Sequence, residues 1–327
     1  MTPPRQTTGS RPRIVARRRK GRALDGVVLL DKPYGLSSND ALQEVRRLLN
    51  AQKAGHTGSL DPLATGLLPL CLGEATKLSS YLLSADKHYR VTAALDHETE
   101  TGDIEGQPTE YAHVALPRLE QLVALLTGFV GQLAQIPPMY SALKIDGKPL
   151  YAYARAGQTV EREPRPVTVH ALDLVAFDAQ AATMTLDVSV SGGTYIRTLV
   201  EDIARSWGGR AHVTALRRTG VGGLVGAGQM VELTRIESDC RGQNAPDGLT
   251  LPTWLLPVSR LLAGWAHIDL DDEQARRIGM GQTLGGFPDL APGPIRLNGP
   301  DGRMIGLGQH KPPNGLSPLR LFSRPLA

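Results

Sequence analysis

The pattern of apolar and polar positions predicts alternating strands and helices over most of the chain. A continuous apolar run at 26–31 is typical of a buried strand. Strict alternation over 183–190 indicates a strand with one buried face. Apolar residues at helical spacing predict helices at about 40–50, 74–84, 117–130 and 196–203, and further strands are expected at 88–95 and 211–219.

The boundaries of two helices carry specific signals. Ser38, Asn39 and Asp40 offer N-caps for the helix at 40–50. Pro117 suits the first turn of the helix that follows it, where a missing N–H costs nothing.

Three segments depart from the periodic pattern. Residues 1–24 mix Pro, Arg, Thr and Gly, so we expect disorder there. Residues 235–250 are polar and read as a long loop. From about Gly264, short apolar runs separated by Gly and Pro indicate a second, small β domain. The predicted organisation is a basic arm at 1–24, a main domain at 25–250 and a small domain at 260–327.

Charge is distributed unevenly along the 327 residues. Residues 1–24 hold eight arginines and lysines and no acidic residue, which leaves 28 basic against 32 acidic side chains in the remainder. Such an arm suits contact with nucleic acid, although a passive solvated tail has the same composition. Any nucleic-acid site on the mildly acidic body must be a local patch.

Several classes of protein find no support in the chain. No uncharged apolar run reaches 18 residues, so no membrane-spanning helix is expected. Cys71 and Cys240 lie far apart, which argues against a disulfide scaffold and fits a reducing cytoplasm. No phosphate-binding loop, dinucleotide fingerprint or close histidine spacing occurs, so neither a nucleotide cofactor nor a metal is expected.

The segment 55–68, GHTGSLDPLATGLL, concentrates the candidate chemistry. Its glycines permit close approach of a ligand or backbone, and Pro62 restrains the direction of Asp61. His56, Ser59 and Asp61 are the residue types of a hydrolase triad, but no nucleophile elbow surrounds the serine, so a hydrolase is only a weak alternative.

A second candidate region is the segment 136–166. It interleaves tyrosines with lysines and arginines, a composition that suits base stacking and phosphate pairing. A solvated hairpin would have the same composition.

The segment 55–68 resembles the catalytic motif of the TruB family of pseudouridine synthases. The resemblance extends over roughly 25–234 and includes five further motifs in family order, at 30–40, 87–91, 137–144, 191–199 and 211–218. The C-terminal segment resembles the family's small RNA-binding PUA-like domain more weakly.

This resemblance implies an α+β pseudouridine synthase fold, with a central mixed, largely antiparallel sheet flanked by helices and a small C-terminal β-barrel-like domain. It implies isomerisation of uridine to pseudouridine at position 55 in the T loop of tRNA, without a cofactor. The implied substrate is the tRNA T arm, and the implied enzyme is a cytoplasmic monomer without a protein partner. The segment 136–166 would close over the RNA, and we expect it to be mobile without RNA.

The resemblance also assigns roles to individual residues. Asp61 would be the catalytic carboxylate, attacking C1′ or acting as a base at the sugar. Arg197 would pair with it, one of the rings of Tyr89 and Tyr195 would stack on the uracil, and the Tyr89 hydroxyl would serve proton removal at C5. The implied substrate contacts are His56 in the space left by the flipped nucleotide, Tyr195 and Leu216 at the uracil, Lys32 at the site or a phosphate, and Lys144, Lys148 and Arg155 at the RNA backbone.

Two alternatives to a stand-alone enzyme remain. One is a guide-RNA-dependent relative, against which the insertion at 136–166 argues. The other is a non-catalytic RNA chaperone, against which the complete set of Asp61, Tyr89, Tyr195 and Arg197 argues.

Overall fold

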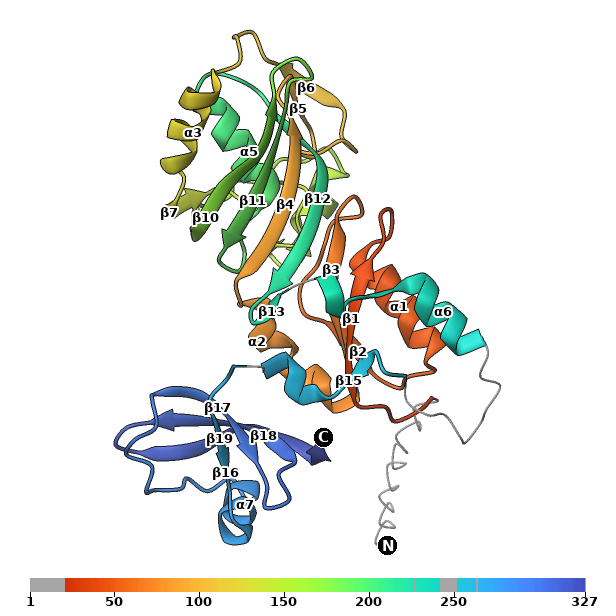
Figure 1. Ribbon diagram of the computed structural model, residues 1–327, viewed down its shortest axis with the longest axis vertical. Helices are drawn as coiled ribbons and strands as arrows, with labels where there is room; N and C mark the ends of the chain where they lie inside the picture. Colours follow the sequence, from red (N-terminus) through yellow and green to blue (C-terminus); the bar gives the residue numbers. More distant parts are fainter. Residues whose placement is uncertain (1–20, 226, 242–251, 263, 327) are drawn as a thin grey trace, which may run out of the picture.

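The computed structural model describes residues 21–225, 227–241, 252–262 and 264–326. An eleven-stranded sheet dominates the first of two parts, with the main strand order β14-β1-β3-β12-β4-β11-β10-β7 (Figure 1). Among the described strands of this sheet, only the β1–β14 and β3–β12 pairs are parallel. The strands are β1 (Gly26–Lys32), β2 (Ala54–His56), β3 (Thr65–Leu72), β4 (Lys87–Ala94), β7 (Gly131–Gln135), β10 (Arg165–Asp178), β11 (Thr183–Val190), β12 (His212–Val221), β13 (Leu224–Val225), β14 (Val231–Glu232) and β15 (Leu255–Leu256).

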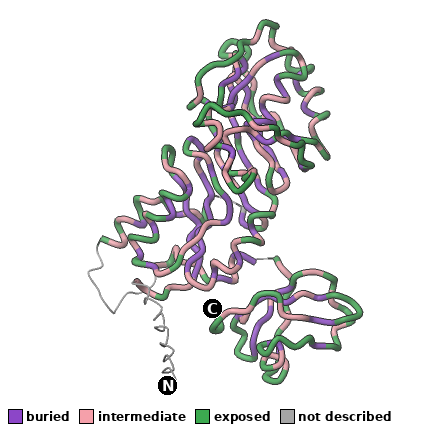
Figure 2. Tube along the Cα trace, turned by 180° about the vertical axis from the view of Figure 1, so that it is seen from behind, coloured by how far each residue is buried: buried purple, intermediate pink, exposed green. Residues whose placement is uncertain are grey.

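Both faces of this sheet are covered where β1 and β3 lie. In β1, Val28 and Leu30 join one hydrophobic cluster, while Val27 and Leu29 join another. The first cluster packs under α1 (Ser38–Leu48), α3 (Leu119–Thr127), α5 (Ile196–Arg205) and α6 (Leu233–Arg241). The second packs under η1 (Gly73–Leu78), α2 (Ser79–Leu83) and η3 (Val258–Leu262). Figure 2 shows the buried residues following the strands.

Two small hairpins extend from this part. One pairs β5 (His97–Thr99) with β6 (Pro108–Tyr111). The other lies in the segment 136–166 and pairs β8 (Lys144–Ile145) with β9 (Lys148–Pro149), followed by α4 (Leu150–Ala154). Its turn is Asp146-Gly147, and both residues have positive φ, as a two-residue hairpin requires.

The second part is a four-stranded sheet with one helix. Its order is β16 (His267–Asp269), β17 (Gly293–Asn298), β18 (Met304–Lys311) and β19 (Gly315–Leu326), with α7 (Asp272–Gly279) between β16 and β17 in sequence. A small cluster that includes Leu297 and Leu316 forms its own core. Met304 and Leu326 belong instead to the cluster beneath η1 and η3, so the two parts share buried apolar contacts.

The fold expected from the sequence is confirmed, including the mixed, largely antiparallel sheet and the C-terminal sheet domain. Strand 183–190 coincides with β11. Three local expectations were wrong. The N-cap of α1 is Ser37, whose hydroxyl accepts from Asp40 N; Pro117 precedes the N-cap of α3, Arg118; and residues 235–241 are helical in α6 rather than looped.

Helix α6 forms because its polar residues pair along the helix. Arg235 contacts Asp239, and Arg241 contacts Glu237, each four residues away, while Ile236 is fully buried. Residues 242–250 of the expected loop and residues 1–20 of the expected arm lie outside the described residues. The expectation of disorder was wrong for residues 21–24, because Arg22 forms an isolated β-bridge with Ala51. Among the described residues, no helix is long and apolar enough to span a membrane.

Candidate active site

The predicted catalytic segment borders a pocket of about 310 Å³. Asp61 lies on the loop after β2, Tyr89 on β4, Leu216 on β12, and Tyr195 and Arg197 at the start of α5. All five were predicted from the sequence, and the structure brings them to one place. The other lining residues are Gly58, Ser59, Leu60, Leu83, Lys87, Ser141, Ala142, Gly193, Thr194, Ile196 and Arg218.

Arg197 organises one wall of this pocket. Its Nη2 lies 3.0 Å from Asp61 Oδ2 and donates to Tyr140 O at 2.8 Å. Its Nη1 lies 3.5 Å from Asp103 Oδ2 and donates to Thr101 O. The guanidinium therefore links the loop of Asp61, the β5–β6 hairpin and the segment 136–166.

The surroundings of Asp61 raise its pKa above the ordinary value of an aspartate. Loss of water around the carboxyl is the main cause, and the negative charge of Asp103 adds to it. Arg197 and Lys32 oppose the rise by stabilising the ionised form. The side chain is 40% exposed, so the carboxylate remains open to a molecule in the pocket.

The facing wall is built on two paired strands. Tyr89 in β4 lies opposite Arg218 in β12, and Leu216 lies opposite Val91. Arg218 is 1% exposed and donates to the carbonyl oxygens of Leu67, Ser59 and Gly58 at 2.7, 3.4 and 3.2 Å. Burial raises the pKa of Tyr89, and Arg218 opposes that rise.

Gly66 allows β3 and β12 to come this close. A Cβ at this position would lie 2.2 Å from Arg218 O, and φ is +96°. Any other residue would push β12 away from the catalytic loop.

Two predicted residues lie beside the pocket rather than in its lining. Lys32 is fully buried and donates to Pro33 O at 2.9 Å and Pro62 O at 3.3 Å, so it holds the loop next to Asp61. Burial lowers its pKa to about 8. His56 ends β2, half-buried, with its Nδ1 3.4 Å from Gly58 N, and burial lowers its pKa.

The three predicted backbone contacts also lie outside the pocket, on the segment 136–166. Lys144 is exposed in β8. Lys148 Nζ lies 4.1 Å from the ring centroid of Tyr153, and the Arg155 guanidinium lies 5.4 Å from that of Tyr151. These pairs place cations beside aromatic faces at the surface.

Three residues of the site were missed by the sequence analysis: Asp103, Lys87 and Arg218. Lys87 and Tyr89 are two apart in β4, as are Leu216 and Arg218 in β12, so each pair shares a face. That periodicity could have identified both cations. Asp103 reaches the site through a bridge between its own backbone and Val213, which no local pattern reveals.

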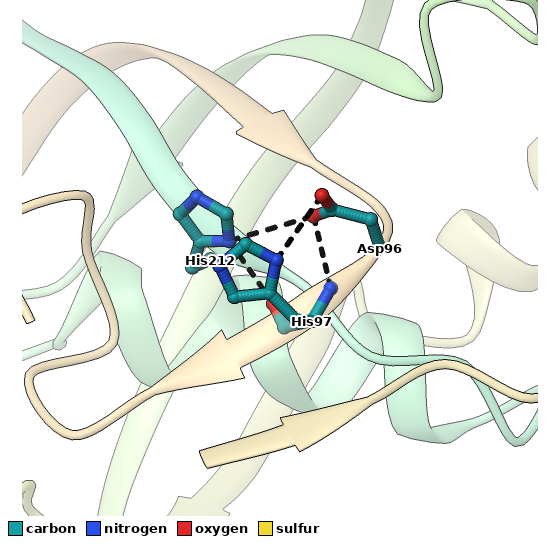
Figure 3. A group of neighbouring side chains, drawn as sticks. All are labelled: Asp96, His97 and His212. Carbon is teal, nitrogen blue, oxygen red and sulfur yellow. Dashed lines mark hydrogen bonds and ion pairs between the residues drawn. The ribbon is translucent and has the colours of Figure 1, made fainter. Parts of the chain in front are cut away.

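Another group of titratable side chains lies at the far end of β4 and β12. Asp96, His97 and His212 are close enough together to be considered as metal ligands (Figure 3). The two rings are tilted by 34° to each other with their centroids 4.2 Å apart, and His212 Nδ1 lies within hydrogen-bonding distance, 3.0 Å, of His97 O. Because His212 Nδ1 already has a backbone oxygen as its partner, we assign no metal to this group.

The fold is similar to that of proteins in solved complexes. The chain matches a protein in "Structure of H/ACA RNP bound to a substrate RNA containing 2'-deoxyuridine" with a TM-score of 0.68 at 20% identity, covering 91% of this chain and 85% of the other. It matches "Crystal Structure of a Cbf5-Nop10-Gar1 Complex" with a TM-score of 0.68 at 22% identity, covering 92% and 84%. At these identities the likeness concerns the fold alone.

The sequence comparisons are more specific. The profile of the TruB family pseudouridylate synthase N-terminal domain matches residues 46–196, and two TruB C-terminal profiles match 197–263 and 266–322. The tRNA pseudouridine synthase B of Sodalis glossinidius is 47% identical over 94% of this chain and 98% of its own length. That of Burkholderia lata is 52% identical over 87% and 86%. The chain belongs to the TruB family of pseudouridine synthases.

Proposed function

We propose that this protein isomerises uridine to pseudouridine at position 55 in the T loop of tRNA, as a stand-alone cytoplasmic enzyme without a cofactor. The observation that carries the proposal is the convergence of Asp61, Tyr89, Tyr195, Arg197 and Leu216 from distant segments on one pocket. The relatives that are 47–52% identical are named tRNA pseudouridine synthase B, which favours tRNA as substrate.

In the proposed reaction, Asp61 acts at the sugar of the bound uridine. The C1′–N1 bond breaks with its electron pair left on the base, either after attack of the carboxylate at C1′ or after proton removal at the sugar. Arg197 favours the ionised form of Asp61 and so opposes the effect of burial on its pKa. The uracil then turns and C5 bonds to C1′, while Asp61 leaves C1′ in the first route or returns the proton to the sugar in the second. N1 takes up a proton, and the proton on C5 leaves with help from the Tyr89 hydroxyl.

The apolar and aromatic lining residues would hold the base while it turns. Tyr195 and Leu216 border the pocket, and either side of a planar base can pack on such surfaces. A stacked T-loop uridine must leave its stack to enter, which costs a few kcal/mol. We propose that His56, beside the loop of Asp61, fills the space that the base leaves.

The test is pseudouridine mapping on an unmodified tRNA transcript, without added metal or cofactor. Wild type should modify one T-loop site, and Asp61→Asn should reduce the product below detection while binding tRNA. Binding without modification by wild type would contradict the proposal and favour a guide-dependent enzyme. Retained biological function of Asp61→Asn would favour an RNA chaperone.

We propose that the segment 136–166 grips the RNA backbone and is mobile without RNA. Its cations at Lys144, Lys148 and Arg155 lie at the surface of this segment. Each phosphate contact releases about one counterion, so Lys148→Ala or Arg155→Ala should weaken tRNA binding and reduce the slope of log Kd against log salt by about 1. Unchanged slopes in both variants would contradict this assignment.

The division into a catalytic domain at 25–250 and an RNA-binding domain at 260–327 is likewise a proposal. It is supported by the two separate sheets and by the small core around Leu297 and Leu316. We also propose that the enzyme is monomeric, which sedimentation of the full chain would test.

A further inference from the structure

The pocket holds more positive than negative charge. Its charged lining residues are Asp61, Lys87, Arg197 and Arg218. Asp61 and the neighbouring Asp103 both form ion pairs with Arg197. Lys87 and Arg218 therefore remain without an acidic partner on the wall that faces Asp61.

Lys87 and Arg218 are both buried and both bound only to neutral oxygens. Lys87 is 6% exposed, and its Nζ donates to Leu83 O and Ala85 O, each at 2.6 Å. Arg218 donates to three backbone carbonyls. Within the described part of the chain, neither forms an ion pair with a carboxylate. An ammonium has three N–H donors, so Lys87 keeps one for another acceptor.

The two cations lie close to each other at the catalytic loop. A Cβ on Gly58 would be 3.8 Å from Arg218 Nη1 and 4.0 Å from Lys87 Cε. Each charge is therefore unfavourable for the other, and burial with Arg218 nearby lowers the pKa of Lys87 to about 8. The negative charge of Asp86 opposes this lowering but forms no ion pair with Lys87 among the described residues. Two buried cations without a paired carboxylate reduce stability unless an anion binds between them and the opposite wall.

The reaction itself produces such an anion. When C1′–N1 breaks, the electron pair stays on the base, and the charge spreads over N1 and the two carbonyl oxygens. Rotation of uracil about the N3–C6 axis exchanges N1 with C5 and O2 with O4. A donor that faces one carbonyl before the turn therefore faces the other afterwards.

We propose that Lys87, supported by Arg218, stabilises the negative charge on the uracil between cleavage of the C1′–N1 bond and formation of the C1′–C5 bond. This inference rests on the proposed function and adds a residue to it. A preorganised charge at the position where charge develops lowers the barrier without reorganisation. The wall would be complementary to the transition state rather than to the neutral substrate.

The experiment measures the single-turnover rate on a tRNA transcript for wild type, Lys87→Met, Lys87→Arg and Lys53→Met. Lys53 is an exposed lysine away from the pocket and serves as the matched control. Lys87→Met should slow the reaction about 100-fold, as loss of one transition-state donor does, with tRNA affinity unchanged. Lys87→Arg should recover part of the rate, and Lys53→Met should match wild type.

Two further readouts separate charge stabilisation from a structural role. A 5-fluorouridine at the target site stabilises the departing anion by itself, so consumption of this substrate should be less impaired in Lys87→Met than consumption of uridine. The rate of wild type should fall above about pH 8 as Lys87 loses its proton, and it should fall less in Lys87→Arg, in which Lys32, with a pKa of about 8, still titrates in this range. The Tm of Lys87→Met should be at or above that of wild type, since a buried charge is removed.

The contradicting outcomes are distinct. Active wild type with an equally fast Lys87→Met would overturn the inference and leave the proposed function standing. Weaker tRNA binding with an unchanged single-turnover rate would make Lys87 a phosphate contact instead. An inactive wild type would overturn the proposed function and this inference with it.

Discussion

Arg197 connects more of the active site than its two ion pairs suggest. Its side chain is 6% exposed and contacts two carboxylates and two backbone carbonyls. The planar fork of a guanidinium serves several acceptors in fixed directions, which a lysine cannot do. Replacing Arg197 would leave Asp61 and Asp103 as neighbouring carboxylates without a cation between them, which favours protonation of one of them.

A first prediction concerns Asp103, which raises the pKa of Asp61. Because Asp61 must be ionised to act, activity should fall as the pH drops through that pKa. Asp103→Asn removes a negative charge, lowers the pKa of Asp61 and should move the acid limb of the pH–rate profile to lower pH. The maximal rate should fall as well, since Arg197 loses a partner. Asp173→Asn, at an exposed carboxylate of β10, is the control; an unmoved acid limb in Asp103→Asn would contradict the prediction.

The sequence identified the residues that carry the reacting groups better than those that set their electrostatics. Asp61, Tyr89, Tyr195, Arg197 and Leu216 lie in contiguous motifs, and all line the pocket. The charges that surround Asp61 come together only when the chain folds. The sequence alone could therefore not show which of them affect the pKa of Asp61.

At the scale of elements, strands with one buried face were predicted best. The alternation of β11 is complete because every second residue points into the core. Helix boundaries were less accurate because several polar residues near each end could serve as caps. For α6, a polar composition concealed a helix stabilised by paired charges and one buried isoleucine.

The cap of α1 provides a second prediction. Ser37 Oγ accepts from Asp40 N at 3.1 Å, whereas the exposed Asn39 makes no capping bond. Ser37→Ala should cost about 1 kcal/mol and lower Tm by about 2–4 °C. Asn39→Ala should leave Tm within about 1 °C of wild type, since surface changes away from such features are small. Equal effects in thermal unfolding followed by circular dichroism would contradict this assignment of the cap.

At the scale of the whole molecule, apolar contacts attach the C-terminal sheet to the large sheet. Met304 and Leu326 share a buried cluster with Val27 and Leu29 of β1. A polar contact accompanies them, since Arg324 Nε donates to Asp25 Oδ2 at 2.9 Å. Because the Arg324 side chain is 55% exposed, this ion pair contributes little.

A third prediction separates the two kinds of contact. Met304→Ala should destabilise the attachment by about 2–5 kcal/mol and increase the radius of gyration measured by X-ray scattering. Arg324→Ala should change neither the radius nor Tm measurably. Met280→Ala, at an exposed methionine of the same sheet domain, is the matched control. A larger effect of Arg324→Ala than of Met304→Ala would show that charge dominates this junction.

The bond from Arg197 to Tyr140 O has a thermodynamic consequence. The same guanidinium nitrogen contacts Asp61 and the segment that we expect to grip RNA. If tRNA shifts that segment, it shifts the proton affinity of Asp61, and linkage then requires the proton to shift tRNA affinity by the same factor. A change in the protonation of Asp61 would thus change the affinity of the enzyme for tRNA. Affinity for an unreactive tRNA analogue, measured against pH, would report this reciprocity directly.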